Sequence, residues 1–561
     1  MNVMFIIRCI SLLLTLTCLN VLAEINIPTS LNGGTIFQEL QPSKSLIRRS
    51  NDNYLQVESS EEVALPDSAP FQVLALKVVG NESIDLETLH ALIQDKEGQE
   101  LSLRQLGELA SLITSYYHNH DYPLAIAIIP SQTIQDGVVT IQVLEASYGN
   151  VLLTNKSRVN QQLLNRSLSG LKSGKKIAGD NLNKTLLLLN DIPGLLVDAS
   201  IKKGQVQGTS DLIINTKDAV GFKAYASLAN SGSASIGRVR GTANLDLVDP
   251  LGLGDVLSFN GLTSGSGMNY GRLSYELLVN GYGTRVGGAY SDLHYQLGQQ
   301  YKALEVHGTS NNYSLWVKQP LIRSLNSNLY AQLEYDRAIL KDHIDFISAK
   351  TDRTIDNVAL NLSGDLRDSW FLGGMSYFNL SFSTGHVGFD DPTAQQSDFL
   401  AGKTQGDFSK LNLSVTKIQQ ISDGITFSGS LSVQVANDNL DSSQKMVIGG
   451  PNSVRAYDVS VLSGDNAQLL TLELRKTISS SIGVWQAVTF YDAGHVEINN
   501  SPWNASKNEA FIQGLGVGLN WQHDSLWGAH VSLATPIGSE PSLVSSSSIG
   551  SRAWAEIRKD F

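Results

Sequence analysis

Hydrophobic residues alternate with small polar residues along most of the second half of the chain. In Ile425–Val435 the odd positions are apolar apart from Gly429, and the even positions carry threonine, serine or glutamine. The same period of two returns in 470–475 and in 515–522. Alternation of this kind predicts strands with one apolar face and one polar face.

These strands fit a membrane barrel better than a soluble sandwich. They carry glycines and charges such as Glu473 and Arg475, which a dry sandwich core does not accommodate and a wet lumen does. Residues 219–561 leave room for about eight hairpins of roughly 40 residues each. We therefore predict a transmembrane antiparallel β-barrel of about 16 strands over 219–561.

The last strand of this pattern runs to the C-terminus. One face carries Ala553, Ala555, Ile557 and Phe561, and the other carries Arg552, Trp554, Glu556, Arg558 and Asp560. Lys559 falls on the apolar face, where its side chain can snorkel to the membrane interface.

Two similar segments precede the barrel. In each of them, stretches with the hydrophobic period of a strand alternate with stretches that have the period of a helix. Residues 71–146 predict strand, helix, helix, strand and strand, with a capping box of Ser102 and Gln105 on the second helix and a turn at Asp136-Gly137. Residues 147–218 repeat this order. The chain is therefore expected to carry a tandem pair of small α+β modules.

The N-terminus has the layout of an export signal. Val3–Ala23 is apolar, with one positive charge at Arg8, so we predict a signal peptide over 1–23. A lipoprotein signal is the alternative, although Thr17 before Cys18 fits it poorly.

Two short segments separate this signal from the first module. Residues 24–41 predict a short helix around Ile36, Phe37 and Leu40, which Gly33-Gly34 should interrupt. Residues 42–70 are polar and marked by prolines, so they read as a linker without a packed core.

Composition narrows the range of functions. The only cysteines, Cys9 and Cys18, lie in the signal stretch, so neither a disulfide nor a cysteine nucleophile is expected in the exported chain. That chain keeps 40 basic and 53 acidic residues, and its net charge of −13 argues against nucleic acid as a partner. Neither His-Glu-x-x-His nor Gly-x-Ser-x-Gly occurs, and no histidine pair has metal-ligand spacing. We expect no enzyme activity, no cofactor and no metal.

Two stretches of the barrel segment stand out. Gly449–Tyr457 belongs to a long connection between two strands, which is either a mobile surface loop or a segment folded back inside. On a later strand Phe490, Asp492 and Gly494 share one face, which directs Asp492 into the lumen. Arg455 on a returning loop would neutralise that carboxylate, or both charges are simply solvated.

These stretches carry a resemblance to a known family. Val454-Arg455-Ala456-Tyr457 resembles the Val-Arg-Gly-Tyr signature at the tip of the sixth extracellular loop in the outer-membrane insertase and transporter superfamily, with Ala456 replacing the glycine. Phe490-x-Asp492-x-Gly494 resembles its partner motif on the barrel wall, and Phe561 resembles the C-terminal targeting signal of bacterial outer-membrane barrels. Asp249–Asp255 fits an early periplasmic turn of that family.

From end to end the chain resembles the TpsB transporters of two-partner secretion. In this resemblance 24–41 is a plug-like helix, 42–70 the linker, 71–146 and 147–218 two polypeptide-transport-associated (POTRA) modules, and 219–561 the barrel. Arg455 with Asp492 would lock the loop inside the lumen, supported by Val454, Tyr457, Phe490 and Gly494.

The resemblance implies a pore in the bacterial outer membrane with its POTRA modules in the periplasm. Such a pore recognises one large TpsA-type exoprotein and secretes it unfolded without ATP. The barrel-assembly machinery would insert it into the lipid bilayer, and we expect a monomer. The alternatives are an insertase of the same superfamily, which usually carries more POTRA modules, and a passive porin, which needs none. The sequence does not distinguish haemolysin, adhesin, haem-binding protein and growth-inhibition toxin as cargo.

Overall fold

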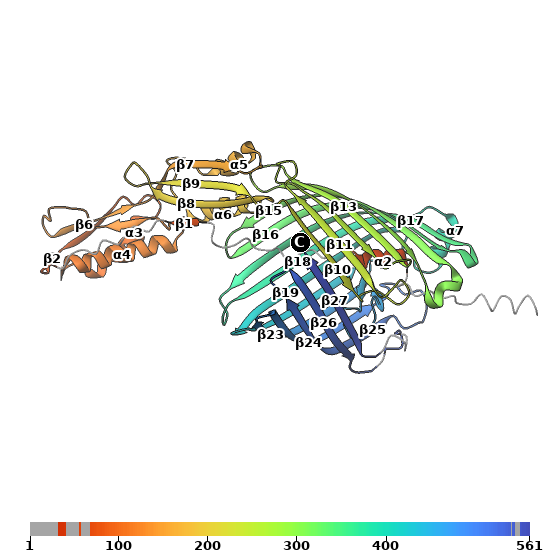
Figure 1. The fold of residues 1–561 in the computed structure, drawn as a ribbon. Coiled ribbons are helices and arrows are strands. Elements are labelled where there is room, and N and C mark those ends of the chain that lie inside the picture. The colour runs from red at the N-terminus through yellow and green to blue at the C-terminus, as the bar shows by residue number, and fades with distance from the viewer. Residues whose placement is uncertain (1–31, 41–54, 58–67, 540, 545–549) are drawn as a thin grey trace, which may run out of the picture.

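A closed β-barrel and two small α+β modules make up the computed structural model of the chain (Figure 1). It describes residues 32–40, 55–57, 68–539, 541–544 and 550–561. The predicted signal peptide, 1–23, lies outside these ranges. Among the residues described, no helix is both long and apolar enough to cross a bilayer.

The barrel has 16 strands in the described part of the chain, which confirms the predicted architecture. Neighbouring strands are antiparallel, and β27 pairs with β10 to close the cylinder. The strands are β10 (Phe222–Ala229), β11 (Arg240–Val248), β12 (Val256–Thr263), β13 (Met268–Leu278), β14 (Arg285–Gln296), β15 (Val306–Arg323), β16 (Ser327–Ile344), β17 (Ala349–Asp368), β18 (Gly374–Phe389), β19 (Gly406–Ser422), β20 (Ile425–Ala436), β23 (Asn466–Ser480), β24 (Gly483–Glu497), β25 (Glu509–Gln522), β26 (Trp527–Pro536) and β27 (Arg552–Asp560).

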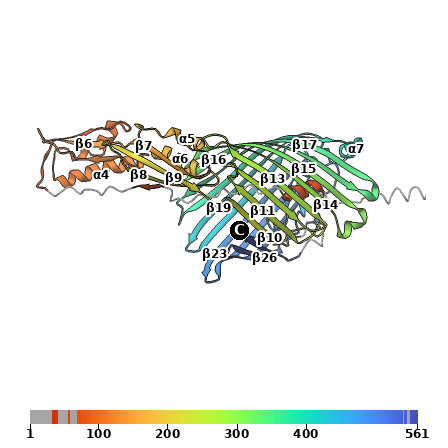
Figure 2. The same cartoon turned by 45° about the horizontal axis from the view of Figure 1, so that its top comes forward.

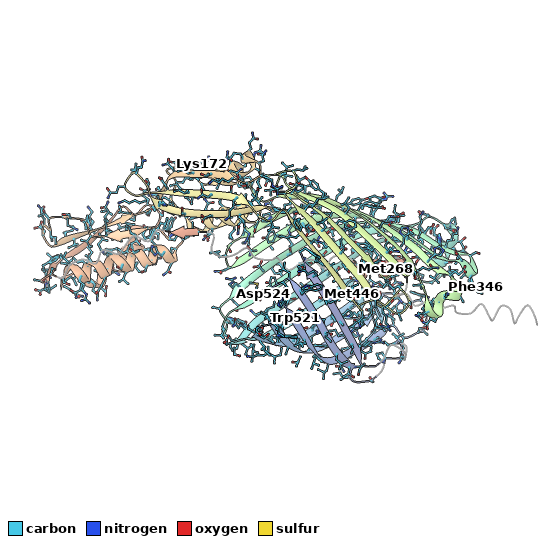
Figure 3. The ribbon with its side chains drawn as sticks, viewed as in Figure 1. Lys172, Met268, Phe346, Met446, Trp521 and Asp524 are labelled. Carbon is cyan, nitrogen blue, oxygen red and sulfur yellow. The ribbon has the colours of Figure 1, made fainter. Side chains whose placement is uncertain are left out.

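The predicted alternation places apolar side chains on the outer surface of these strands. On β25, Leu515, Val517 and Leu519 are about half exposed on the outer surface, where a bilayer would cover them. Short turns such as the one near Trp521 and Asp524 lie toward the α+β modules, and Phe346 in the β16–β17 hairpin lies at the opposite end (Figure 3). The barrel therefore has one end beside the modules and one end far from them.

Helix α2 (Gly33–Leu40) lies inside the barrel, where it contacts β15 and β16 (Figures 1 and 2). The predicted N-terminal helix is thus present, but the expectation that Gly33-Gly34 would interrupt it is wrong. A Cβ at Gly33 would lie 2.7 Å from a carboxylate oxygen of Asp342, and one at Gly34 would lie 2.4 Å from Ser442 Oγ. Because only glycine permits this approach, the first turn of α2 packs with Gly33 against the barrel wall and Gly34 against the connection between β20 and β23.

The first module contains the predicted elements with one difference. They are β2 (Phe71–Val73), β3 (Ala75–Val79), α3 (Leu86–Ala91), β4 (Gln99–Leu101), α4 (Leu103–Asn119), β5 (Ile126–Ile128) and β6 (Val138–Leu144). The predicted strand 71–79 is divided at Leu74, whose N–H donates to the carbonyl of Gly137. The capping box of Ser102 and Gln105 on α4 is confirmed.

A buried carboxylate holds the end of this module together. Glu145 is almost fully buried and accepts hydrogen bonds from the N–H groups of Glu82 and Ser83 and from the Tyr117 hydroxyl. Burial alone would raise the pKa of Glu145, but these hydrogen bonds outweigh it and bring the pKa below its ordinary value. The stability that Glu145 contributes is therefore present above its unfolded-state pKa and is lost as the pH falls through its folded-state pKa.

We expect Glu145→Gln to lower the stability of the first module at pH 7 by about 1–3 kcal/mol. The amide NH2 would replace the oxygen that accepts from the Ser83 hydroxyl and pairs with Lys176, and the neutral amide oxygen is a weaker acceptor than a carboxylate oxygen. The difference from the native chain should shrink below about pH 4. Urea unfolding followed by circular dichroism at 222 nm, which reports α4, measures both effects. Glu108→Gln on the exposed face of α4 is the matched control, and an equal effect of the two variants would contradict this role of Glu145.

The second module repeats the order of the first. Its elements are β7 (Ser147–Lys156), α5 (Gln161–Ser167), α6 (Gly179–Asn190), β8 (Leu195–Lys203) and β9 (Thr209–Asp218). Residues 42–70 are predicted to be a linker without a packed core; within them β1 (Leu55–Val57) pairs in parallel with β8 and so joins the sheet of the second module. An edge strand presents unpaired backbone groups, and this short segment of the chain satisfies them. The other residues of 42–67 lie outside the described ranges.

The second module is fastened to the barrel by an ion pair. Arg323 on β15 donates to both carboxylate oxygens of Asp191, at 2.7 and 2.8 Å, just after α6. The β11–β12 turn, Asp249–Asp255, also contacts this module, because the Asn160 N–H donates to the Gly252 carbonyl. These contacts fix the module at the end of the barrel that carries the short turns.

Candidate functional site

The long connection between β20 and β23 is folded back into the barrel. Residues 437–465 include a small hairpin of β21 (Met446–Ile448) and β22 (Leu462–Gly464), and the segment between these two strands is largely buried. Of the two alternatives for this connection, the structure therefore has the internal one. We call residues 437–465 the returning loop.

Arg455 and Asp492 meet at the tip of the returning loop. Arg455 Nε donates to Asp492 Oδ2 and Nη2 donates to Oδ1, both at 2.8 Å. The backbone N–H of Arg455 also donates to Oδ2 at 3.2 Å. The Asp492 side chain is 1% exposed and that of Arg455 is 9% exposed. The two predicted residues are thus joined in a bidentate, buried pair.

Three further side chains complete the surroundings of Arg455. Glu473 on β23 accepts from Nη1 at 2.7 Å, and the guanidinium lies 3.3 Å above the centre of the Phe490 ring. The indole N–H of Trp554 on β27 donates to the Arg455 carbonyl at 2.8 Å. Sequence reasoning did not assign Glu473 and Trp554 to the site, although it placed both on faces that point into the lumen.

The supporting motif residues pack around this pair. Val454 is fully buried, and a Cβ at Gly494 would approach its side chain to 3.2 Å and that of Ile448 to 2.7 Å. Tyr457 is buried as well. Ala456, which replaces the family glycine, does not have a positive φ, so its backbone needs no glycine.

The charges of this cluster are mutually dependent. Removing an arginine and two carboxylates from water is unfavourable unless each finds close partners of opposite charge. Arg455 satisfies Asp492 and part of Glu473, and Arg475 donates to the other oxygen of Glu473. Loss of one partner would leave a buried charge uncompensated, so this cluster holds the returning loop only as a complete set.

The N-terminal end of α2 is held by a second charged cluster. The Gly33 N–H donates to Asp342 Oδ1 at 3.0 Å, and Arg353 Nη1 donates to Asp342 Oδ2 at 2.7 Å. Arg353 Nε donates in turn to Asp441 of the returning loop at 2.5 Å. This cluster therefore joins the helix, the barrel wall and the loop.

The C-terminal end of α2 is held in the same way. Arg240 on β11 donates to Glu39 at 2.9 Å, and Ser460 of the returning loop donates to the other oxygen of Glu39. Gln38 donates to the Ser443 carbonyl at 2.6 Å. The sequence indicated none of these partners, because they are distant along the chain and no local pattern connects them.

A polar cavity of about 570 Å³ lies inside the barrel, and a second cavity of about 400 Å³ lies beside Arg455. The larger cavity is lined by α2, by the returning loop and by side chains such as Asn312, Asp336 and Asn357 on the barrel wall. In the described part of the chain no group of three metal-ligating side chains comes together. Phe561 lies at the barrel closure, where its N–H donates to the Ala224 carbonyl.

The sequence matches the profile of a known family over more than half of its length. The family is described as haemolysin secretion/activation protein ShlB/FhaC/HecB, and the match covers residues 208–521. The chain belongs to this family. A second profile, the ShlB-type POTRA domain, matches residues 71–146.

Individual relatives extend this likeness over most of the chain. The haem/hemopexin transporter protein HuxB of Haemophilus influenzae is 29% identical over 507 residues, which are 89% of this chain and 88% of HuxB. The outer membrane transporter CdiB of Dickeya dadantii is 21% identical over 70% of this chain and 71% of CdiB. As a TpsB-family member, the chain is an outer-membrane transporter of two-partner secretion with its POTRA modules in the periplasm.

Solved structures with the same fold agree with the architecture. CdiB from Escherichia coli has a TM-score of 0.69 at 20% identity and covers 90% of this chain and 92% of its own. BamA from Haemophilus ducreyi, lacking POTRA domains 1–3, has a TM-score of 0.53 at 14% identity and covers 88% and 100%. These solved structures therefore share the fold of this TpsB-family chain, a barrel preceded by POTRA modules.

Proposed function

We propose that the chain secretes one large partner exoprotein, which its POTRA modules recognise in the periplasm and its barrel conducts unfolded to the cell surface. The observation that carries the proposal is the filling of the lumen by α2 and the returning loop. Both are held there by hydrogen bonds and ion pairs, which an entering polar chain can replace, and by the packing of buried apolar side chains such as Phe37 and Val454. Folding of the partner outside the cell would make passage irreversible without ATP.

Recognition requires backbone groups that are free to pair with an extended chain. In the first POTRA module the sheet order β3-β6-β5 leaves β3 and β5 as edges, and in the second β7 is an edge while β1 covers β8. An unfolded segment can add to such an edge through main-chain hydrogen bonds. We therefore assign partner recognition to these edges.

In this proposal the ion pair of Arg455 and Asp492 at the tip of the returning loop determines which conformation of the pore can conduct the partner. Arg455 and Asp492 hold the loop against the wall formed by β23, β24 and β27, next to the closure of the barrel. We propose that this arrangement positions the loop during transport rather than merely stabilising the barrel. The cargo itself is unassigned, and the likeness to HuxB makes a partner that acts in haem acquisition the first candidate.

Deleting residues 71–146 tests the proposed function. We expect the deletion to abolish release of the co-expressed partner into the medium, measured by immunoblot, because the edges of the first POTRA module are lost. The ion conductance of the purified barrel in planar bilayers should remain largely unchanged. Secretion at the native level would contradict partner recognition by this module. A general loss of other outer-membrane barrels in cells carrying the deletion would instead favour the insertase alternative.

A further inference from the structure

A groove crosses the outer surface of the barrel where β27 meets β10. One hydrogen-bonding row of outward-facing residues follows its floor from strand to strand: Lys559, Ala226, Ala243, Gly261, Gly271 and Asp292. The four central residues carry no side chain beyond a methyl group. The groove above them has a volume of about 940 Å³.

Large apolar side chains border this floor on both sides. Each of these side chains lies two residues from a floor residue on the same strand and therefore on the same outer face. Phe259 and Leu273 lie on one side of the floor, and Leu228 and Ile557 lie on the other. All four are about half exposed. The floor is therefore a recess between apolar ridges on the surface that meets the hydrocarbon of the bilayer.

Among the residues that the structure describes, none requires glycine at 261 and 271. Neither glycine has a positive φ. A Cβ at Gly271 would meet no atom within 4 Å, and one at Gly261 would meet a carbon of the Phe259 ring at 3.4 Å, an ordinary contact. Glycine weakens a strand, so glycines that no contact within the chain requires need another explanation. They indicate that a molecule outside the chain approaches the strands closely here.

A cation without a carboxylate partner closes one end of the groove. The Lys559 ammonium lies 5.7 Å from the Trp527 ring and 5.8 Å from the Phe561 ring, and it donates a hydrogen bond to the Ser525 carbonyl. Among the described residues it forms no salt bridge. Lys417, which also faces outward, is by contrast paired with Asp368. Since β10 directly follows the second POTRA module, the Lys559 end faces the periplasm.

We propose that this groove binds one anionic phospholipid of the periplasmic leaflet, with its phosphate on Lys559 and an acyl chain along the floor. A lysine between interfacial aromatic rings attracts anionic headgroups. The row from Lys559 to Asp292 crosses five strand spacings. This length of about 24 Å exceeds the roughly 15 Å of hydrocarbon in one leaflet, so an acyl chain fits. The lipid would lie across the closure between β27 and β10.

Native mass spectrometry of the detergent-purified chain, titrated with phosphatidylglycerol, phosphatidylethanolamine or lipid A, tests this site. We expect the native chain to retain phosphatidylglycerol with roughly fivefold preference over phosphatidylethanolamine. Lys559→Gln should lose this preference. Gly271→Leu should reduce retention of both phospholipids, because the leucine side chain would occupy the floor at a position where a Cβ meets no atom within 4 Å.

Two variants outside the groove serve as controls. Lys476→Gln changes a lysine near the same membrane interface, and Gly388→Leu changes a glycine with no atom near its Cβ position; both should bind as the native chain does. Heat-modifiable electrophoretic migration identifies folded barrels, which keeps the comparison valid if Lys559→Gln inserts poorly. Equal retention of phosphatidylglycerol by folded Gly271→Leu and the native chain would overturn the site. Preference for lipid A over phosphatidylglycerol would overturn the assignment to the periplasmic leaflet.

Discussion

Replacing Asp492 with alanine is expected to cut secretion of the partner exoprotein at least roughly tenfold while the barrel stays folded in the membrane. The substitution leaves the buried Arg455 guanidinium with Glu473 alone, and breaking a buried ion pair in this way typically costs about 3–5 kcal/mol. That loss is large enough to release the tip of the returning loop. Arg455→Ala should have the same effect, because Asp492 then stays buried without its cation.

Secreted partner per folded barrel, quantified by immunoblot of the medium, measures this prediction. Arg337→Ala is the matched control, since Arg337 and Asp356 form an exposed pair at 3.8 Å whose loss should change little. Arg455→Lys should fall between the two, because an ammonium cannot reproduce the bidentate contact. Normal secretion by both Asp492→Ala and Arg455→Ala would show that the lock has no part in transport.

Deleting residues 24–41 is expected to raise the ion conductance of the purified barrel in planar bilayers several-fold. With α2 in place, the helix and the returning loop line a cavity of about 570 Å³ inside the barrel. A helix with its side chains is about 10–12 Å wide, so its removal opens a passage of comparable width. The deletion must retain the signal peptide so that export continues.

Gly33→Leu provides an independent test of the same idea. A side chain there would collide with Asp342 and Tyr295, so the helix should leave its seat and conductance should rise without any deletion. Gly388→Leu on the outer surface, where a Cβ meets nothing, should conduct like the native chain. Unchanged conductance in both the deletion and Gly33→Leu would remove the assignment of α2 as a plug.

The strands could be predicted because their signal is local. A period of two in 425–435 or 515–522 reports which face meets lipid, and it does so without knowledge of the neighbouring strands. The pairing of Arg455 with Asp492 could be anticipated for a related reason, since a carboxylate directed into the lumen needs a cation. Even so, the residues left a solvated alternative open, and only the position of the returning loop excludes it.

The anchors of α2 could not be predicted in the same way. Arg353 meets Asp342 across a hairpin and Asp441 across a long connection, so their contact depends on the register of several strands at once. The pairing of β1 with β8 could not be predicted either, because three residues are too few to show the alternation that marks a strand. Helix propensity alone predicts a break at Gly33-Gly34, because it does not include the close packing of the helix inside the barrel.

The pairing of β27 with β10 also determines at which stage of folding the pore forms. Tyr225 faces Asp560, so closure joins parts of the chain that are over 300 residues apart. Every other barrel pairing joins a strand to the next barrel strand along the chain. Closing so long a loop first would cost about 2.5 kcal/mol more than forming a hairpin of about 20 residues. We therefore expect hairpins to form before closure, and a chain that lacks its last strand would leave β10 without its closing partner.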